Sequence, residues 1–281
     1  MTALLLNGKD LAAKKREQLK RDVEELATQQ IVPGLAVILV GEDPASQTYV
    51  RAKQKACEQA GIHSVLIEKP NTITEEELLR EIDRLNEDPT IDGILVQLPI
   101  PDHISEQAVI ERIAPNKDVD GFHPINIGKM MTGEDTFLPC TPFGVVEMLK
   151  EANIDLVGKH VVVVGRSNIV GKPVGQLLLN EHATVTYTHS KTKNLREMTN
   201  LADILIVAIG KPEFISAEDV KDGAVVVDVG INRVDGKLVG DVEFNGVKEK
   251  ASYITPVPGG VGPMTITMLL ENTVLSARKR P

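Results

Sequence analysis

The sequence predicts an α/β protein built as two lobes with a cleft between them. Three observations favour this fold class. Several short runs are apolar at every position, which is typical of strands buried on both faces of a parallel sheet. Glycine or proline breaks the chain near these runs, and segments with helical apolar spacing separate them. The runs lie within Leu35–Val40, Gly93–Val96, Val161–Val164, Asp203–Gly210 and Ala224–Asn232.

Composition narrows the class of protein further. Of 281 residues, 42% are hydrophobic but only 3% are aromatic, so Val, Ile, Leu and Ala must build the core. The net charge of −9 argues against a nucleic-acid partner, because phosphate binding needs a basic face. No apolar run approaches membrane-spanning length, and the N-terminus lacks the pattern of a secretory signal. With two cysteines and no His or Cys cluster, we expect a reduced, cytoplasmic protein without a bound metal.

The first half of the chain alternates helices and strands. Helical spacing predicts a helix over residues 7–30, and the strand at 35–40 follows it. Asp43 suits a helix start and Gly61 a helix end, so we expect a helix over 44–60, in which Tyr49 and Lys53 share one face. The next elements expected are a strand at 64–69, a helix from a capping box at 74–77 to about 86, the strand at 93–96 and a helix at 105–113.

The second half is expected to form a separate domain. Residues 126–142 are rich in helix breakers and should be irregular, so the N-terminal domain is placed at 1–141. A helix at 145–153 and strands at 161–164, 183–190, 203–210, 224–232 and 253–255 predict a Rossmann-like, doubly wound domain over 142–263. A final helix from 264 to about 278 should return to the first domain, so that residues 264–281 complete it.

The segment Val161–Gly175, with the sequence VVVVGRSNIVGKPVG, joins a buried strand to a helix through a glycine turn. This geometry presents free backbone N–H groups and a helix N-terminus to a phosphate, and Gly165 lets the backbone approach a ligand closely. Ser167 occupies the place of the second glycine in the G-x-G-x-x-G motif. An ordinary βα turn has the same glycines, so the turn alone leaves a nucleotide site and a purely structural turn open.

The next strand favours the nucleotide site and indicates the cofactor. In NAD-binding folds an Asp or Glu stands near the end of this strand, about 20 residues after the glycines. Here the strand ends in His189-Ser190-Lys191, without a carboxylate. The Ser190 hydroxyl, the nearby lysines and Arg166 suit a 2′-phosphate, which predicts NADP rather than NAD. The lysines also fit a solvated surface, which is the commoner environment of lysine.

Seven segments, the glycine turn included, carry distinctive patterns over nearly the whole chain: YVRAKQKACEQAGI (49–62), DGILVQLPIP (92–101), NKDVDGFHPINIG (116–128), PCTPFG (139–144), GRSNIVGKPVG (165–175), VVVDVGIN (225–232) and TPVPGGVGPMT (255–265). Together they resemble the bifunctional methylenetetrahydrofolate dehydrogenase/cyclohydrolase family. The resemblance implies hydride transfer from 5,10-methylenetetrahydrofolate to NADP⁺, then hydrolysis of the methenyl product to 10-formyltetrahydrofolate. It also implies a homodimer. A monofunctional NADP-dependent dehydrogenase of the same fold is the alternative enzyme, and a nucleotide-binding regulatory protein without turnover is an alternative of a different class.

The resemblance places Lys53 at the reacting carbon. A partly desolvated lysine has a lowered pKa and can transfer protons near neutral pH, although without the resemblance a surface lysine is the favoured interpretation. Gln97, at a strand end, is expected to hydrogen-bond Lys53, and Tyr49 to help orient it. Asp120 is expected to accept hydrogen bonds from the pterin amino group and ring N–H. Asp118 has either a similar role or the structural one of capping its loop.

The remaining site residues are also implied by the resemblance. Gly165, Arg166, Ser167 and Ser190 are expected on NADP, with Ile231 near the nicotinamide. The residues expected at the folate are Tyr49, Lys53, Val96, Gln97, Leu98, Asp120, Pro258 and Gly259.

Overall fold

The computed structural model describes residues 2–280 and divides into two compact units. Lys14–Cys140 and the chain from Ile266 onward form the three-stranded unit, and the chain up to Ala13 together with Thr141–Thr265 forms the six-stranded unit. Both units are α/β, with parallel main sheets, so the predicted fold class is confirmed. Among the described residues, no helix combines the length and apolar character needed to span a bilayer.

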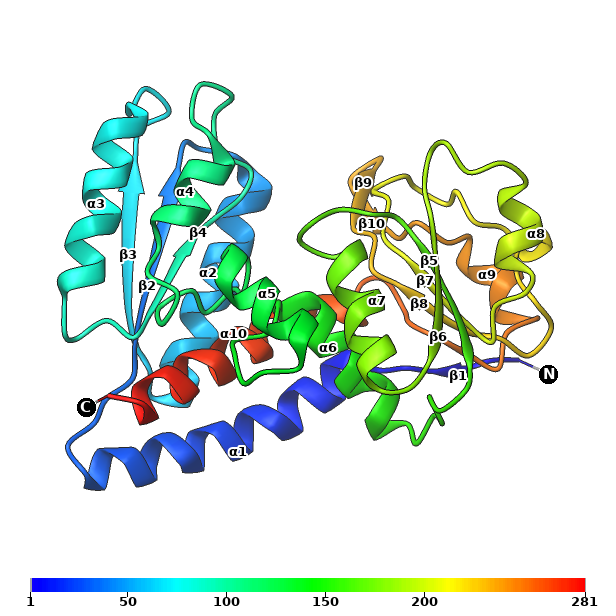
Figure 1. The fold of residues 1–281 in the computed structure, drawn as a ribbon, viewed down its shortest axis with the longest axis horizontal. Helices are drawn as coiled ribbons and strands as arrows, with labels where there is room; N and C mark the ends of the chain where they lie inside the picture. The colour runs from blue at the N-terminus through cyan, green and yellow to red at the C-terminus, as the bar shows by residue number, and fades with distance from the viewer. Residues whose placement is uncertain (1, 281) are drawn as a thin grey trace. The chain divides into compact units, whose positions relative to one another are not determined.

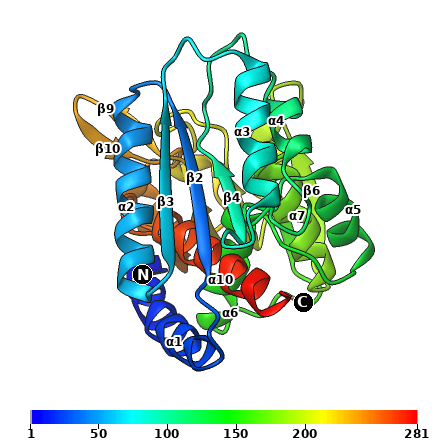
Figure 2. The ribbon, with the colours of Figure 1, turned by 90° about the vertical axis from the view of Figure 1, so that its left-hand side faces the viewer.

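The three-stranded unit has a parallel sheet of order β3–β2–β4, formed by His63–Lys69, Gly34–Val40 and Gly93–Val96. Helix α2 (Pro44–Ala60) lies on one face, and α3 (Glu75–Glu87) and α4 (Glu106–Arg112) lie on the other (Figure 2). Alternate β2 residues, Ala36, Ile38 and Val40, pack in one core cluster with the apolar stripe of α3. The other helices of this unit are most of α1 (Gly8–Thr28), α5 (Pro124–Thr132) and most of α10 (Val261–Arg278).

Helix ends in this unit follow the local sequence. The Asp43 side chain accepts a hydrogen bond from Ser46 N at 2.7 Å, and Gly61 ends α2 with φ +77. Thr74 and Glu77 form the predicted capping box at the start of α3. Because α2 begins and ends where predicted, Tyr49 and Lys53 are one turn apart on it.

The six-stranded unit has the strand order β1–β11–β8–β7–β5–β6, with every pair of neighbours parallel. Helix α7 (Gly171–Asn180) covers one face, while α8 (Leu195–Thr199) and α9 (Phe244–Lys248) lie on the other (Figure 1). The strands are Leu4–Leu5 (β1), His160–Val164 (β5), Thr184–Thr188 (β6), Ile204–Val207 (β7), Val225–Asp228 (β8) and Tyr253–Ile254 (β11). The hairpin β9 (Asn232–Val234) and β10 (Lys237–Val239), the 3₁₀ turn Ala217–Asp219 and α6 (Cys140–Glu151) complete the unit.

Strand β5 sits where the chain direction across this sheet reverses. The chain leaves β5 through α7 to β6 on one side, and β7 pairs with β5 on the other side. In doubly wound sheets a ligand binds outside the carboxyl ends of the strands at this switch point. The glycine turn that begins at Gly165 therefore occupies the position that the fold favours for a nucleotide.

Three sequence expectations differ from the structure. Residues 126–142 were expected to be irregular, yet α5 begins at Pro124, where the His123 side chain accepts from Ile125 N, and α6 begins at Cys140. The strand expected to reach residue 232 ends at Asp228, and a hairpin follows it. The chain up to Ala13 groups with the six-stranded unit, because β1 pairs with β11; we had placed it in the N-terminal domain.

Candidate functional site

Lys53 and Gln97 meet at the carboxyl end of the three-stranded sheet. Lys53 projects from α2 and is only 8% exposed, and its Nζ donates to Gln97 Oε1 at 2.9 Å. Gln97 follows directly after β4, and its amide nitrogen donates to the Leu98 carbonyl at 2.6 Å. Since both ends of the Gln97 amide are engaged, its oxygen is held toward the lysine. The hydrogen bond expected from the sequence is therefore present.

The charge state of Lys53 is governed by its burial. Desolvation lowers the pKa of its ammonium group, and the negative charge of Asp120 opposes that shift. A buried lysine with one amide partner gives up its proton more readily than a surface lysine. Such a group can act as a proton acceptor near neutral pH.

Asp120 lies in the segment between α4 and α5, and its carboxylate acts on Lys53. Burial raises the pKa of Asp120, while the Lys53 ammonium and the nearby Cys140 thiol lower it. The next residue, Gly121, has φ +78, and a Cβ there would lie 2.6 Å from the Leu138–Pro139 peptide. Only glycine allows the two segments to pass this closely.

Cys140 was missed as a site residue by sequence reasoning. It is fully buried, its Sγ lies 3.2 Å from the Val119 carbonyl, and its backbone N–H donates to the Asp120 carbonyl at 3.3 Å. Burial raises the pKa of its thiol well above the usual range, so it is a neutral donor rather than a thiolate. The only signal in the sequence was its place in the PCTPFG segment.

The other residues expected at the folate from this unit differ in exposure. Tyr49 is half-buried one turn before Lys53, and desolvation raises the pKa of its phenol. Leu98 is partly exposed at the strand end. The Val96 side chain instead packs in the core cluster beneath α3, so only its backbone is available to a ligand.

Asp118 has a structural environment. It is 2% exposed and accepts hydrogen bonds from Phe122 N, His123 N and the Asn126 amide. Desolvation nevertheless raises its pKa to about 6. These contacts favour the loop-capping role over a contact with substrate.

The glycine turn of the six-stranded unit is shaped for close approach. Gly165 has φ +127, and a Cβ there would overlap the Ala208 carbonyl oxygen of β7's following loop. The Ser167 hydroxyl accepts from Val170 N at 3.2 Å and from Gly171 N at 3.1 Å, which fixes the entry to α7. Arg166, between them, is exposed and its side chain is free to reach a phosphate.

The remaining expected cofactor residues lie on the same unit. Ser190 is exposed in the turn after β6, and Ile231 is 42% exposed in the loop after β8. A Cβ on Gly262 would lie 3.5 Å from Ile231 Cδ1, so the start of α10 lies close to Ile231, and the loop containing Pro258 and Gly259 directly precedes it in the chain. That loop is fixed to the start of α1, where Lys9 N donates to the Gly259 carbonyl at 2.9 Å.

Two buried aspartates, also missed from the sequence, hold the loops around Ile231. Asp228 accepts from the backbone N–H groups of Gly230, Asp241 and Val242, each at 2.9 Å. Asp241 accepts from three consecutive backbone N–H groups, residues 209–211, and from the Asn232 amide. Burial raises the pKa of Asp228 to about 6. Both carboxylates are saturated by the protein, so they shape the site rather than bind a ligand.

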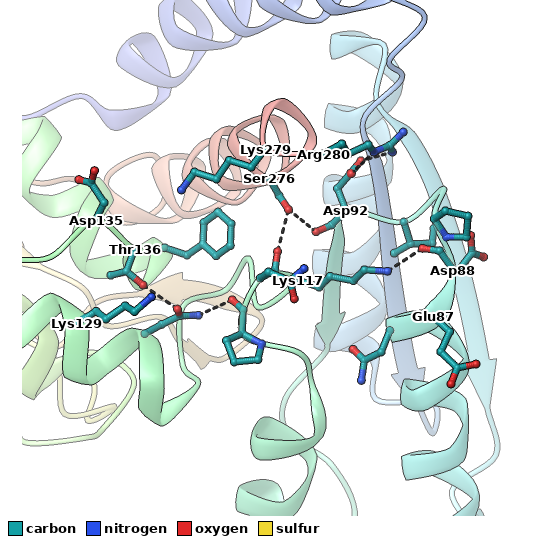
Figure 3. A pocket seen from close by; sticks show the side chains of 17 residues that line it. Glu87, Asp88, Asp92, Lys117, Lys129, Asp135, Thr136, Ser276, Lys279 and Arg280 are labelled. Atoms are coloured by element: carbon teal, nitrogen blue, oxygen red, sulfur yellow. Dashed lines mark hydrogen bonds and ion pairs between the residues drawn. The ribbon is translucent and has the colours of Figure 1, made fainter.

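A cavity of about 610 Å³ lies elsewhere in the three-stranded unit, between the ends of α3, α5 and α10 (Figure 3). None of the expected site residues lines it. Its polar groups are largely paired with one another, as in the two hydrogen bonds from Arg280 to Asp92 and those from Lys117 to backbone carbonyls. Across residues 2–280, no group of three or more His, Cys, Asp or Glu side chains is arranged to hold a metal ion.

Comparisons with known proteins bear on both units. The family model for the catalytic domain of tetrahydrofolate dehydrogenase/cyclohydrolase matches residues 6–120, and that for its NAD(P)-binding domain matches residues 139–281. The chain is 73% identical over 279 residues to the bifunctional protein FolD of Halalkalibacterium halodurans, covering 99% of this chain and 100% of the relative.

Two solved structures are similar over nearly their whole length. The FolD methylenetetrahydrofolate dehydrogenase/cyclohydrolase of Campylobacter jejuni has a TM-score of 0.97 and 55% identity, covering 99% of this chain and 100% of that one. The Trypanosoma brucei FolD, complexed with NADP cofactor and an inhibitor, has a TM-score of 0.95 and 40% identity, covering 99% and 98%.

Proposed function

Because the chain belongs to the tetrahydrofolate dehydrogenase/cyclohydrolase family, we propose that it catalyses two consecutive reactions on one folate, with Lys53 as the proton carrier of the second. In the first, the methylene carbon of 5,10-methylenetetrahydrofolate loses a hydride. In the second, water adds to the methenyl cation, the bond from that carbon to N5 breaks, and 10-formyltetrahydrofolate and one proton are released. The hydrogen bond from the buried Lys53 to Gln97 is the observation that carries this proposal.

The first reaction makes modest demands on the protein. Loss of hydride leaves a cation that both flanking nitrogens stabilise, so the step needs orientation more than a strong base. NADP⁺, when bound, supplies the hydride acceptor. The half-buried Tyr49 and the carboxylate of Asp120 are suited to orient the folate.

The second reaction needs proton transfer. Neutral Lys53 takes a proton from the attacking water and returns one to N5 as the ring opens. The second proton of that water is released, so each turnover yields 10-formyltetrahydrofolate and one proton. Desolvation favours the neutral amine that begins this cycle, and Asp120 stabilises the ammonium that forms within it. Gln97 keeps Nζ in place through both states, since its oxygen accepts a hydrogen bond from either form.

The residues of the glycine turn fit NADP. Gly165 passes so close to the Ala208 carbonyl that only glycine fits there, and this fixes the backbone of the turn. Arg166 and the Ser190 hydroxyl, both exposed, provide a guanidinium and a donor for the 2′-phosphate. Strand β6 and the turn after it, which contains Ser190, lack the carboxylate that would repel this phosphate.

The test uses purified protein, NADP⁺ and 5,10-methylenetetrahydrofolate, with absorbance read for NADPH and for the methenyl intermediate. A bifunctional enzyme forms NADPH, and it hydrolyses added methenyltetrahydrofolate faster than buffer does. A monofunctional dehydrogenase would form NADPH while hydrolysis stayed at the buffer rate. A regulatory nucleotide-binding protein would form no NADPH at any protein concentration.

We further propose a cytoplasmic homodimer. The exposed apolar residues Val234 and Leu238 on the β9–β10 hairpin support an association surface, and the free, buried thiols of Cys57 and Cys140 suit a reducing compartment. Sedimentation analysis at micromolar concentration should give twice the mass of one chain for the wild type and a monomer for Val234→Lys. A monomeric wild type would contradict the proposal.

A further inference from the structure

Asn272 connects the C-terminal helix to the Asp120 loop. It lies on α10, is 3% exposed, and its amide nitrogen donates to the Val119 carbonyl at 2.8 Å and to the Leu138 carbonyl at 3.0 Å. The same nitrogen lies 3.7 Å from Cys140 Sγ. One side-chain amide thus spans two segments that adjoin Asp120 and Cys140.

These contacts fix the backbone of Asp120 from both directions. The Val119 carbonyl, just before Asp120, accepts from Asn272 and from the Cys140 thiol. The Asp120 carbonyl accepts from Cys140 N. Because Gly121 passes against the Leu138–Pro139 peptide, the two segments have no room to close further if the amide is lost.

A second α10 residue holds the same loop nearer its start. Ser276, one turn after Asn272, has its hydroxyl 2.9 Å from the Asp92 carbonyl and 2.9 Å from the Asn116 carbonyl (Figure 3). Helix α10 therefore holds the loop at residues 116 and 119. The contact at 119 is adjacent to the carboxylate, and the contact at 116 is four residues from it.

We propose that Asn272 is a positioning residue for the cyclohydrolase step, acting on Lys53 through Asp120. The inference rests on the proposed roles of Lys53 and Asp120. Without the amide, the segment from Val119 to Gly121 loses its tether to α10, and the Asp120 carboxylate is no longer fixed beside Nζ. When the Asp120 carboxylate is misplaced in this way, we expect the hydrolysis rate to fall on the order of 10- to 100-fold.

The test is a double-mutant cycle of Asn272→Ala with Asp120→Ala, measured as kcat/KM for methenyltetrahydrofolate hydrolysis. If Asn272 acts through Asp120, its substitution lowers kcat/KM by about tenfold or more in the wild type and by less than about twofold in the Asp120→Ala background. If Asn272→Ala lowers kcat/KM by the same factor in both backgrounds, the inference about Asn272 is overturned, while the proposed role of Asp120 stands. No effect of Asp120→Ala by itself would remove the proposed role of Asp120 and the inference with it.

A merely structural role is distinguished by a matched control and a pH profile. Thr273 is fully buried on the same helix, and its hydroxyl donates to the Leu269 carbonyl of its own helix, so Thr273→Val removes a hydrogen bond within α10 rather than one to the loop. The titratable groups that face Lys53 are the Asp120 carboxylate and the thiols of Cys140 and Cys57, and burial raises the pKa of both thiols so that they stay neutral. Displacement of the Asp120 carboxylate from Lys53 should lower the apparent pKa of hydrolysis in Asn272→Ala, and Thr273→Val should leave that pKa unchanged.

NADP⁺ affinity provides the last arm, and in both variants it should stay within about twofold of wild type because the glycine turn keeps its own contacts. If Asn272→Ala does not fold, Asn272→Ser leaves a smaller cavity and enters the same cycle with the same criteria. A profile that shifts equally in both helix variants would contradict the positioning role.

Discussion

Replacing Lys53 by Met separates the two proposed reactions most sharply. Methionine has nearly the length and apolar volume of the lysine stem, so the 8%-exposed site stays filled while the ammonium is lost. A positioned proton carrier contributes on the order of 10²- to 10⁴-fold, and the hydrolysis rate should fall by that factor. Gln97 loses its partner, which costs about 1–3 kcal/mol of stability, partly offset because a desolvated charge is removed.

The assay follows loss of methenyl absorbance after the wild-type protein, Lys53→Met or Lys55→Met is added. Lys55 is exposed on the same helix, two residues away, and controls for charge and helix propensity. We expect Lys55→Met to match the wild type, and we expect NADP⁺ affinity to be unchanged in both variants. Hydrolysis by Lys53→Met within twofold of wild type would refute the reasoning.

Three further substitutions test separate parts of the structure. Arg166→Ala should weaken NADP⁺ binding about 10- to 100-fold, which corresponds to the loss of one charge-assisted hydrogen bond to phosphate, and should weaken NAD⁺ binding far less. Fluorescence titration measures both affinities. Equal losses for the two cofactors would contradict the assignment of Arg166 to the 2′-phosphate. Burial raises the pKa of Asp118 to about 6 in the folded state, so the wild type loses unfolding free energy as pH rises from about 4 to 6. Asp118→Asn lacks this ionisation and should therefore gain up to about 3 kcal/mol relative to the wild type over that range. Urea unfolding at each pH measures this difference, and a constant difference would be evidence against it. Thr74→Ala should lower unfolding free energy by about 1 kcal/mol through loss of the α3 capping box, and an unchanged melting temperature would count against that cap.

Elements whose ends are set by local chemistry could be predicted from the sequence. Helix α2 lies between Asp43 and Gly61 because both caps act within one turn of the chain. Helix α5 was missed because its signals, His123 as cap and Pro124 at the first turn, stand among residues that otherwise read as breakers. Strand β1 has two residues and exists only through pairing with β11, so no local pattern could reveal it.

The site divides in the same way. Tyr49 and Lys53 were paired from helical spacing, and the Gln97 contact followed from its place at a strand end. The environment of Lys53 could not be read from the sequence, because Asp120, whose charge acts on its pKa, is brought to α2 by long-range folding. No sequence pattern indicated a role for Asn272. Its hydrogen-bond partners, Val119 and Leu138, lie 153 and 134 positions away in the chain, so the role of this polar residue on an apolar helix can be recognised only in the folded structure.

The pH dependence of methenyltetrahydrofolate hydrolysis, corrected for the buffer reaction, tests the role of Lys53 most directly. Because neutral Lys53 is the active form and burial lowers its pKa, the wild-type rate should rise with pH to a plateau whose midpoint lies below the usual lysine range. In Lys53→Met this rise should be absent. A midpoint in the ordinary lysine range, or the same profile in both proteins, would contradict the account.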